Sequence, residues 1–307
     1  MKTTHGRMPK LGFLLLGALA FFWGLNWPIM KIALREIRPW TFRSLSLILG
    51  GLGVLGIAKA NRLQLAVPKI ERRPLFVVAF LNVTCWQMFS AYGLIFMKAG
   101  RATIVAFSMP IWASLLAVIV LGERLTLSRL MGLGLGMAAL GVLMGRSIEA
   151  FGSTPLGTIF MLAAAMSWAA GTVFIKYFRW TIPTLTLTGW QLLSGSIPVV
   201  LGTLVLEPVS AVSLISWQGA LATAYVIIFP MIFCYWAWFK VVQLFPASIA
   251  AVGTLAIPIV GVFSSALVLG ESIGFQEVTA LILMTLALAI VMIRPGGFSR
   301  STLGVKH

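Results

Sequence analysis

Residues 102–144 read ATIVAFSMPIWASLLAVIVLGERLTLSRLMGLGLGMAALGVLM, and residues 250–292 read AAVGTLAIPIVGVFSSALVLGESIGFQEVTALILMTLALAIVM. Adding 148 to a residue number takes Pro110 to Pro258 and Leu121-Gly122-Glu123 to Leu269-Gly270-Glu271, with no gap in either copy. A fixed repeat of this length in a chain of 307 residues indicates two related halves. We therefore expect the function to lie where the halves meet.

The composition is that of a membrane protein. The chain is 60% hydrophobic, with a mean hydropathy of +1.01, and only 10% of its residues are charged, whereas soluble domains carry roughly 25%. Apolar runs of about 20 residues, long enough to cross a hydrocarbon core of about 30 Å, recur along it. These runs predict an all-α integral membrane protein with ten transmembrane helices, at about 11–34, 39–58, 74–97, 102–121, 126–145, 155–175, 183–206, 216–240, 247–270 and 275–293.

The strong basic excess is explained by topology. The net charge is +16, from 23 Lys and Arg against seven Glu and no Asp, and the cations are scattered at the ends of the spans. This distribution favours contact with anionic lipid headgroups and gives no reason to expect nucleic acid as a partner. Sixteen of the 23 cations fall on the side of the N-terminus. We therefore expect a multi-pass protein of a bacterial inner membrane with both termini cytoplasmic.

Each half holds five spans, so the second half enters the membrane upside down relative to the first. We expect the halves to be residues 1–146 and 147–307. Inverted-topology repeats of this kind are a recurring plan of secondary transporters, because they supply two exchangeable conformations. Matching extends beyond the quoted stretch and pairs Trp23 with Trp168, Arg43 with Gln191, Cys85 with Cys234, and Trp86 with Tyr235.

The chain resembles a ten-span member of the drug/metabolite transporter superfamily with two EamA-type halves. The resemblance rests on Trp23-Gly24, Arg43 and the run from Pro110 to Glu123, with their partners Trp168, Trp190-Gln191 and the run from Pro258 to Glu271. The aromatic content is similar to that of YddG-type exporters of aromatic and other amino acids. The resemblance implies a central cavity formed by spans 1, 3, 4, 6, 8 and 9, with spans 5 and 10 at the periphery.

Polar and aromatic residues in the middle of spans are the candidate substrate ligands, because such positions are costly unless they serve a function. Asn82, Trp86 and Ser90 recur every four residues, which predicts one helical face. Aromatic walls offer stacking and a cation–π seat for an ammonium group, while Asn and Ser can hydrogen-bond a carboxylate. The alternative for the tryptophans is lipid packing. The predicted substrate-binding set is Trp23, Asn26, Asn82, Trp86, Ser90, Ser108, Trp112, Trp168, Tyr235 and Trp238.

The cations near the spans have simpler interpretations. Lys31, Lys98, Lys176 and Lys240 lie close to span ends, where long side chains reach the interface. Arg43 lies about one turn into span 2. Its match to Gln191 predicts a structural hydrogen-bonding role, with loop carbonyls as acceptors.

Several chemistries are missing from the sequence. It contains no Asp, no Glu deep in a span, and no His outside the termini. Proton antiport usually needs an embedded acid or histidine, so we expect movement without obligatory proton coupling. No HExxH motif or catalytic triad occurs, and we expect neither an enzyme nor a bound metal or cofactor.

The sequence therefore predicts export of small metabolites by alternating access, with amino acids, including aromatic ones, as the first class of substrate. An exporter of other metabolites or hydrophobic amine drugs is the alternative transporter. A membrane scaffold or chaperone is the alternative outside that class. The substrate itself, the oligomeric state and the resting conformation stay open.

Overall fold

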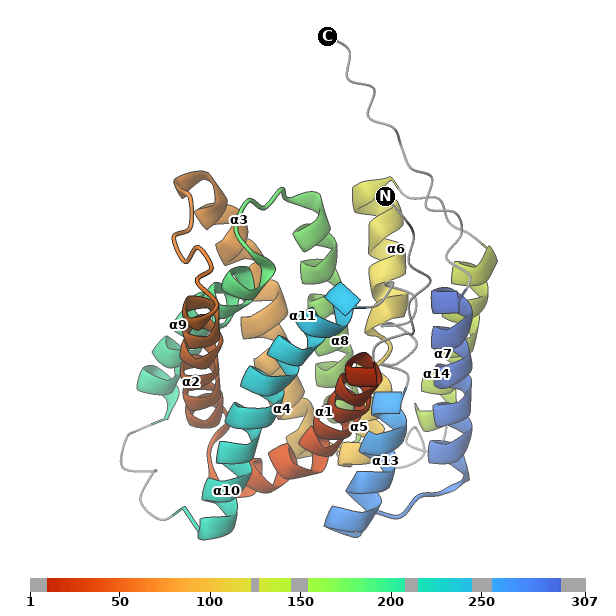
Figure 1. The fold of residues 1–307 in the computed structure, drawn as a ribbon. Coiled ribbons are helices and arrows are strands. Elements are labelled where there is room, and N and C mark those ends of the chain that lie inside the picture. Colours follow the sequence, from red (N-terminus) through yellow and green to blue (C-terminus); the bar gives the residue numbers. More distant parts are fainter. Residues whose placement is uncertain (1–9, 123–126, 145–153, 208–214, 245–255, 294–307) are drawn as a thin grey trace.

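The computed structural model describes residues 10–122, 127–144, 154–207, 215–244 and 256–293. These residues are helical throughout, apart from short connections (Figure 1). Seven helices are long and apolar enough to cross a membrane, and three shorter apolar helices, at Leu130–Ala139, Ala256–Leu269 and Phe275–Ala287, occupy the remaining positions. The all-helical membrane fold is confirmed. The first part of predicted span 9 lies outside the described residues.

Six of the spans are single helices. They are α1 (Lys10–Glu36), α2 (Pro39–Ala60), α7 (Leu127–Met144), α8 (Thr154–Tyr177), α9 (Thr184–Leu206) and α14 (Phe275–Ile293). Span 3 consists of α3 (Lys69–Ala79), the π-helical turn η1 (Phe80–Cys85) and α4 (Trp86–Phe96). Span 4 is divided into α5 (Ala99–Ala106) and α6 (Met109–Leu121), and span 8 into α10 (Trp217–Val226), η3 (Ile227–Phe233) and α11 (Cys234–Leu244). The described part of span 9 is α13 (Ala256–Leu269).

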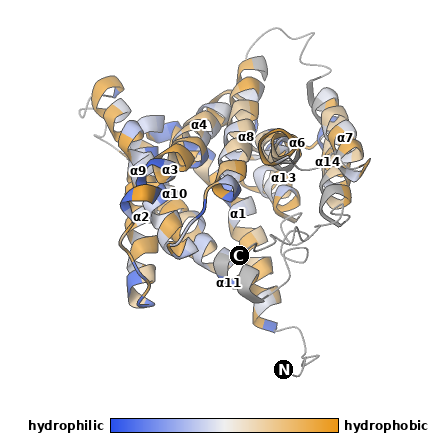
Figure 2. Cartoon of the chain, turned by 90° about the horizontal axis from the view of Figure 1, so that it is seen from above, coloured by the Kyte–Doolittle hydropathy of each residue, from blue (hydrophilic) through white to orange (hydrophobic). Residues whose placement is uncertain are grey.

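Helix packing follows the two-fold relation of the halves. The matched helices α2 and α9 pack on each other, and so do α7 and α14. Span 1 (α1) packs on span 9 (α13), and its counterpart, span 6 (α8), packs in the same way on span 4 (α5 and α6). Likewise span 3 (α4) packs on span 6 (α8), and span 8 (α10 and α11) packs on span 1 (α1). Figures 1 and 2 place α2 and α9 at one edge and α7 and α14 at the other, with α1, α8, α6 and α13 between them. Spans 5 and 10 therefore have the peripheral place that the resemblance implies.

Glutamates of one half bind helix starts of the other half. The Glu207 carboxylate accepts hydrogen bonds from the backbone N–H of Trp40 at 3.1 Å and of Thr41 at 2.8 Å, at the start of α2. Glu36 accepts from the N–H of Ser216, the residue before α10, at 2.8 Å. A helix N-terminus carries unpaired N–H groups and a partial positive charge, so a carboxylate stabilises it. These contacts also fix which span ends share one side of the bundle.

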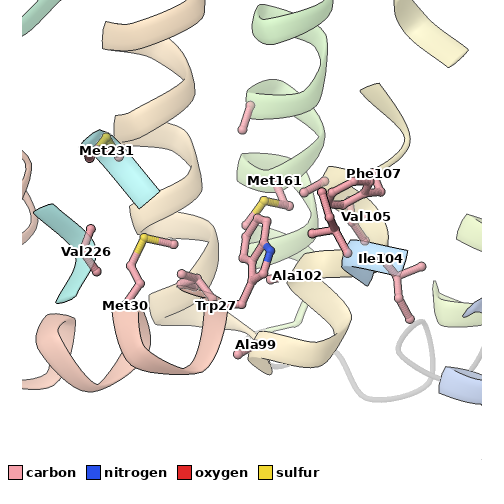
Figure 3. Packing of buried hydrophobic residues seen from close by; sticks show 14 of the residues in the cluster. Trp27, Met30, Ala99, Ala102, Ile104, Val105, Phe107, Met161, Val226 and Met231 are labelled. Atoms are coloured by element: carbon pink, nitrogen blue, oxygen red, sulfur yellow. The ribbon is translucent and has the colours of Figure 1, made fainter. Parts of the chain in front are cut away.

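A continuous apolar core fills the bundle between these ends. Trp27 and Met30 of α1, Ala99 and Ala102 of α5, and Met161 of α8 belong to it (Figure 3). Large apolar side chains are also exposed on the outer faces, where a lipid environment receives them, and Figure 2 shows hydrophobic residues along all the helices. Strongly exposed examples are Leu52, Ile119, Leu204, Val205 and Leu267.

Two glycines end matched helices in a left-handed conformation. Gly122 follows α6 with φ +66°, and Gly270 follows α13 with φ +67°. Glycine adopts this conformation without the steric cost that a Cβ brings, and it commonly ends helices. The doubled Leu-Gly-Glu motif therefore has a backbone reason for its glycine.

We expect Gly270→Ala to destabilise the protein by about 1–2 kcal/mol, because alanine strains the left-handed conformation. Gly17→Ala is the matched control, since an added Cβ there meets nothing within 4 Å and the site lies inside α1, where alanine is favoured. Thermal unfolding of the purified protein in detergent measures both. Equal loss in the two variants would contradict the assigned role of Gly270.

Candidate functional site

Two aromatic pairs form at matched positions of the two halves. The rings of Trp86 (α4) and Trp168 (α8) lie 5.1 Å apart between centroids. The rings of Trp23 (α1) and Tyr235 (α11) lie 6.3 Å apart and nearly perpendicular, at 84°. Because Trp23 matches Trp168 and Trp86 matches Tyr235, each pair is the counterpart of the other. Trp238 extends the second pair, 6.2 Å from Trp23.

Two asparagines near these pairs present acceptors without donors. The Oδ1 atoms of Asn26 and Asn82 are buried and have no hydrogen-bond partner among the described residues. Asn26 follows Trp23 by one helical turn in α1. Asn82 lies in η1, four residues before Trp86, and its side chain packs on Gly171 of α8. Buried polar atoms in native proteins are normally paired, so these two unpaired acceptors call for an explanation.

Ser90 faces a different neighbour from Asn82 and Trp86. Its Oγ accepts a hydrogen bond from Arg43 Nη2 of α2 at 3.0 Å and donates one to the Gln87 carbonyl at 3.2 Å. The expected single face is therefore divided, with Asn82 and Trp86 against α8 and Ser90 against α2. Trp86 and Ser90 both lie in α4, which packs on α8 and also contacts α2. Residues four apart in an α-helix differ by about 40° around its axis, so these two side chains can border different neighbours.

Ser108 and Trp112 bind each other where span 4 is broken. The Trp112 indole N–H donates to Ser108 Oγ at 3.1 Å, and Ser108 Oγ donates to the Val105 carbonyl at 2.7 Å. Pro110, the second residue of α6, lacks an N–H, which interrupts the helical hydrogen bonds at this point. Ser108 and Trp112, both predicted as ligands, thus stabilise the break between α5 and α6.

Arg43 is buried, with 1% of its surface exposed, and makes the structural hydrogen bonds expected for it. Its Nε donates to the Gln87 carbonyl at 3.0 Å, and Nη2 also donates to Met30 Sδ at 2.8 Å. The carbonyl acceptor belongs to α4 and not to a loop.

The snorkelling interpretation of Lys31 is wrong. Its ammonium group pairs with Glu271 at 3.2 Å and donates to the Met97 carbonyl at 2.6 Å. Glu271 also accepts from the N–H groups of Ala99 at 2.8 Å and Gly100 at 3.0 Å, at the start of α5. This cluster joins the ends of spans 1, 3, 4 and 9. In the sequence, the doubled Leu-Gly-Glu motif marks Glu271, and Lys31 matches Lys176 at an offset of 145, but neither signal indicates that the two residues pair.

The π-helical turns η1 and η3 are a second feature that sequence periodicity misses. They occupy residues 80–85 and 227–233, which overlap when 149 is added to the first range. π-Helical turns occur frequently at functional sites. Trp86 directly follows η1, and Tyr235 follows the end of η3 by two residues.

Residues 10–145 and 155–293 each match the EamA-like transporter family. The chain belongs to the EamA-like transporter family. The double match agrees with the repeat seen in helix packing. In the described part of this EamA-like transporter, no three His, Cys, Asp or Glu side chains gather as a metal-binding group.

Relatives of this EamA-like transporter cover nearly its whole length. It is 27% identical over 301 residues to the uncharacterized transporter YvbV of Bacillus subtilis (strain 168), covering 96% of this chain and 95% of that protein. It is 28% identical to a probable amino-acid metabolite efflux pump of Salmonella typhimurium, covering 90% and 92%. A solved crystal structure matches with a TM-score of 0.64 at 20% identity, covering 91% and 98%, which shows the shared fold. The family and these names indicate a transporter and not an enzyme.

We expect Trp86→Ala and Trp168→Ala to be coupled in a double-mutant cycle of unfolding free energy. Their ring contact should give a coupling of about 0.5–1.5 kcal/mol. The control cycle combines Trp86→Ala with Trp217→Ala, since Trp217 is 69% exposed at the start of α10 and separate sites add within about 0.5 kcal/mol. Additive effects in the first cycle would show that the rings do not stabilise each other.

Proposed function

We propose that this EamA-like transporter exports amino acids, including aromatic ones, across the bacterial inner membrane, with both termini cytoplasmic. The observation that carries the proposal is the pair of matched aromatic contacts, Trp23 with Tyr235 and Trp86 with Trp168. The name of the Salmonella typhimurium relative, probable amino-acid metabolite efflux pump, supports the same class of substrate.

The chemistry of the site suits a zwitterion with a ring. Indole and phenol faces stack with an aromatic side chain and attract an ammonium group. The Oδ1 atoms of Asn26 and Asn82 accept hydrogen bonds from the same ammonium group. In this proposal both aromatic pairs line one central cavity, together with Trp238. Ser90, Ser108 and Trp112 act behind it by holding helices in place.

Alternating access follows from the matched positions of the pairs. Trp23 and Tyr235 join spans 1 and 8, while Trp86 and Trp168 join spans 3 and 6, which are their counterparts in the other half. We propose that the halves, residues 1–146 and 147–307, exchange conformations so that each pair in turn lies beside the open side. The Lys31–Glu271 cluster then holds span ends together on one side of the membrane.

A hydrophobic amine is the second candidate substrate. The unpaired asparagine oxygens and the aromatic faces all favour a cation and need no carboxylate. An exporter of amine drugs would use the same cavity and the same two conformations. The two candidates differ in whether the substrate requires a negative group.

We expect counterflow of L-phenylalanine in proteoliposomes, with an apparent affinity that falls several-fold in Trp86→Ala and in Trp168→Ala. Losing one aromatic contact costs about 0.5–1.5 kcal/mol, and 1.4 kcal/mol is about tenfold. Leu286→Ala is the control, since Leu286 is 49% exposed on α14 at the edge of the bundle. Wild-type affinity in both tryptophan variants, at equal monodispersity, would remove these rings from the site.

We expect an imposed pH gradient to leave the final distribution of the substrate across the liposome membrane unchanged. The described glutamates sit at helix ends in hydrogen bonds, and none lies free in the middle of a span. Without an embedded acid the substrate should equilibrate along its own gradient. Uphill accumulation in response to the gradient, absent with an ionophore, would reveal a proton-carrying group.

A further inference from the structure

The buried guanidinium of Arg43 is a positive charge without a negative partner. Its acceptors are the Gln87 carbonyl, the Ser90 hydroxyl and the Met30 thioether, all of which are neutral. The chain contains no aspartate. Every glutamate that the structure describes bonds elsewhere. Glu36 accepts from Ser216, Glu71 from Thr181, and Glu207 from Trp40 and Thr41. Glu271 pairs with Lys31 and accepts from Ala99, and Glu277 pairs with Arg101. Within the described residues, nothing therefore neutralises this charge.

A buried charge without a counter-ion is unfavourable in a membrane protein, and such residues commonly serve function. Helix packing at this position does not require the charge. The matched residue in α9 is Gln191, which is buried with 7% exposed and is neutral. Arg43 therefore keeps a charge at a position that the second half fills with an amide.

Arg43 joins α2 to the spans that carry the aromatic pairs. Its hydrogen bonds reach α1 through Met30 and α4 through Gln87 and Ser90, and Figure 3 shows Met30 directed into the bundle. Gln87 directly follows Trp86 and also bonds the Met231 thioether of η3, four residues before Tyr235. Tyr235 contacts Trp23 of α1, so the spans around Arg43 are those of both aromatic pairs.

The guanidinium keeps donors for such an anion. Nε and Nη2 make the hydrogen bonds named above, and Nη1 makes none to any residue that the structure describes. Arginine is well suited to carboxylates, because its planar fork offers parallel N–H groups with a fixed charge. The existing bonds to Gln87 and Ser90 hold the fork in place before an anion arrives.

We infer that Arg43 is the counter-charge for the carboxylate of the transported substrate. This inference rests on the proposed function and decides between its two candidates. The carboxylate binds at Nη1 of Arg43, while the ring and ammonium group lie toward Trp23, Tyr235 and the asparagine oxygens. A hydrophobic amine places only a cation beside Arg43, which repels it.

Three probes that share one ring test the assignment: L-phenylalanine, phenethylamine, which lacks the carboxylate, and 3-phenylpropanoate, which lacks the ammonium group. Dissociation constants are measured on the purified full-length protein. We expect wild type to bind both carboxylates at least about tenfold more tightly than phenethylamine, which corresponds to about 1.4 kcal/mol. A wild-type protein that binds phenethylamine as tightly as L-phenylalanine overturns the inference without any variant.

Arg43→Gln places the second half's own residue at this position. We expect it to weaken both carboxylates about tenfold and to leave phenethylamine unchanged or tighter. Arg43→Lys keeps the charge and should keep part of the preference. Arg35→Gln, an exposed arginine at the end of α1, controls for net charge and should behave as wild type. Parallel weakening of all three probes in Arg43→Gln would show a purely structural arginine and overturn the inference.

Failure of the proposed function gives a different result. If L-phenylalanine does not bind but 3-phenylpropanoate binds in an Arg43-dependent manner, amino-acid export is overturned and the carboxylate site stands. If Arg43→Gln does not fold, the wild-type ratio and Arg43→Lys decide, since a lysine variant without carboxylate preference counts against the site. Absence of binding by all three probes to wild type overturns both proposals.

Discussion

The two halves of this molecule are joined at their ends by contacts between a carboxylate of one half and a helix start of the other. Each helix start leaves backbone N–H groups unpaired, and the membrane offers them no water. Glu207 at α2, Glu36 at α10 and Glu271 at α5 supply the missing acceptors from across the boundary between halves. The same contacts fasten the two repeats to each other at their ends. The middle of the bundle is thus left to apolar and aromatic packing.

This use of acids constrains the chemistry of the whole protein. The chain contains no aspartate, and each described glutamate lies at a helix end in a hydrogen bond or ion pair. Among the described residues, Arg43 therefore has no carboxylate partner inside the bundle. The proposed transport without proton coupling and the unpaired charge of Arg43 both follow from this placement of the carboxylates at span ends.

The fold could be predicted from the sequence because membrane spans depend on local properties. Predicted spans 39–58 and 275–293 correspond to α2 (Pro39–Ala60) and α14 (Phe275–Ile293), since apolar length and end charges are readable directly. The break after Ala106 has a local signal in Pro110. The turn η1 has none, because tertiary contacts with α8 and α9 decide which helical hydrogen bonds slip by one residue.

The candidate ligands also differ in how far the sequence could predict their contacts. The repeat relates the Trp86–Trp168 contact to the Trp23–Tyr235 contact, and this equivalence can be read from residue numbers. Partners on other spans cannot be read in this way. Ser90 turned out to bind Arg43 and Lys31 to bind Glu271, across 47 and 240 residues of sequence. In a dry interior a polar group binds whichever neighbour tertiary packing supplies.

The two halves differ in a way that bears on how a substrate is oriented. Aromatic residues are matched between halves, so both sides of the midplane can offer rings. Polar groups are matched less well: Arg43 of the first half corresponds to the neutral Gln191 of the second, and Asn26 and Asn82 correspond to Gly171 and Met231. In the proposed function, a substrate that stacks on rings would find similar surfaces in both conformations, which suits alternating access. Its carboxylate would find a counter-charge in the first half alone. The proposal therefore assigns passage to the rings, and the orientation of the substrate to the first half.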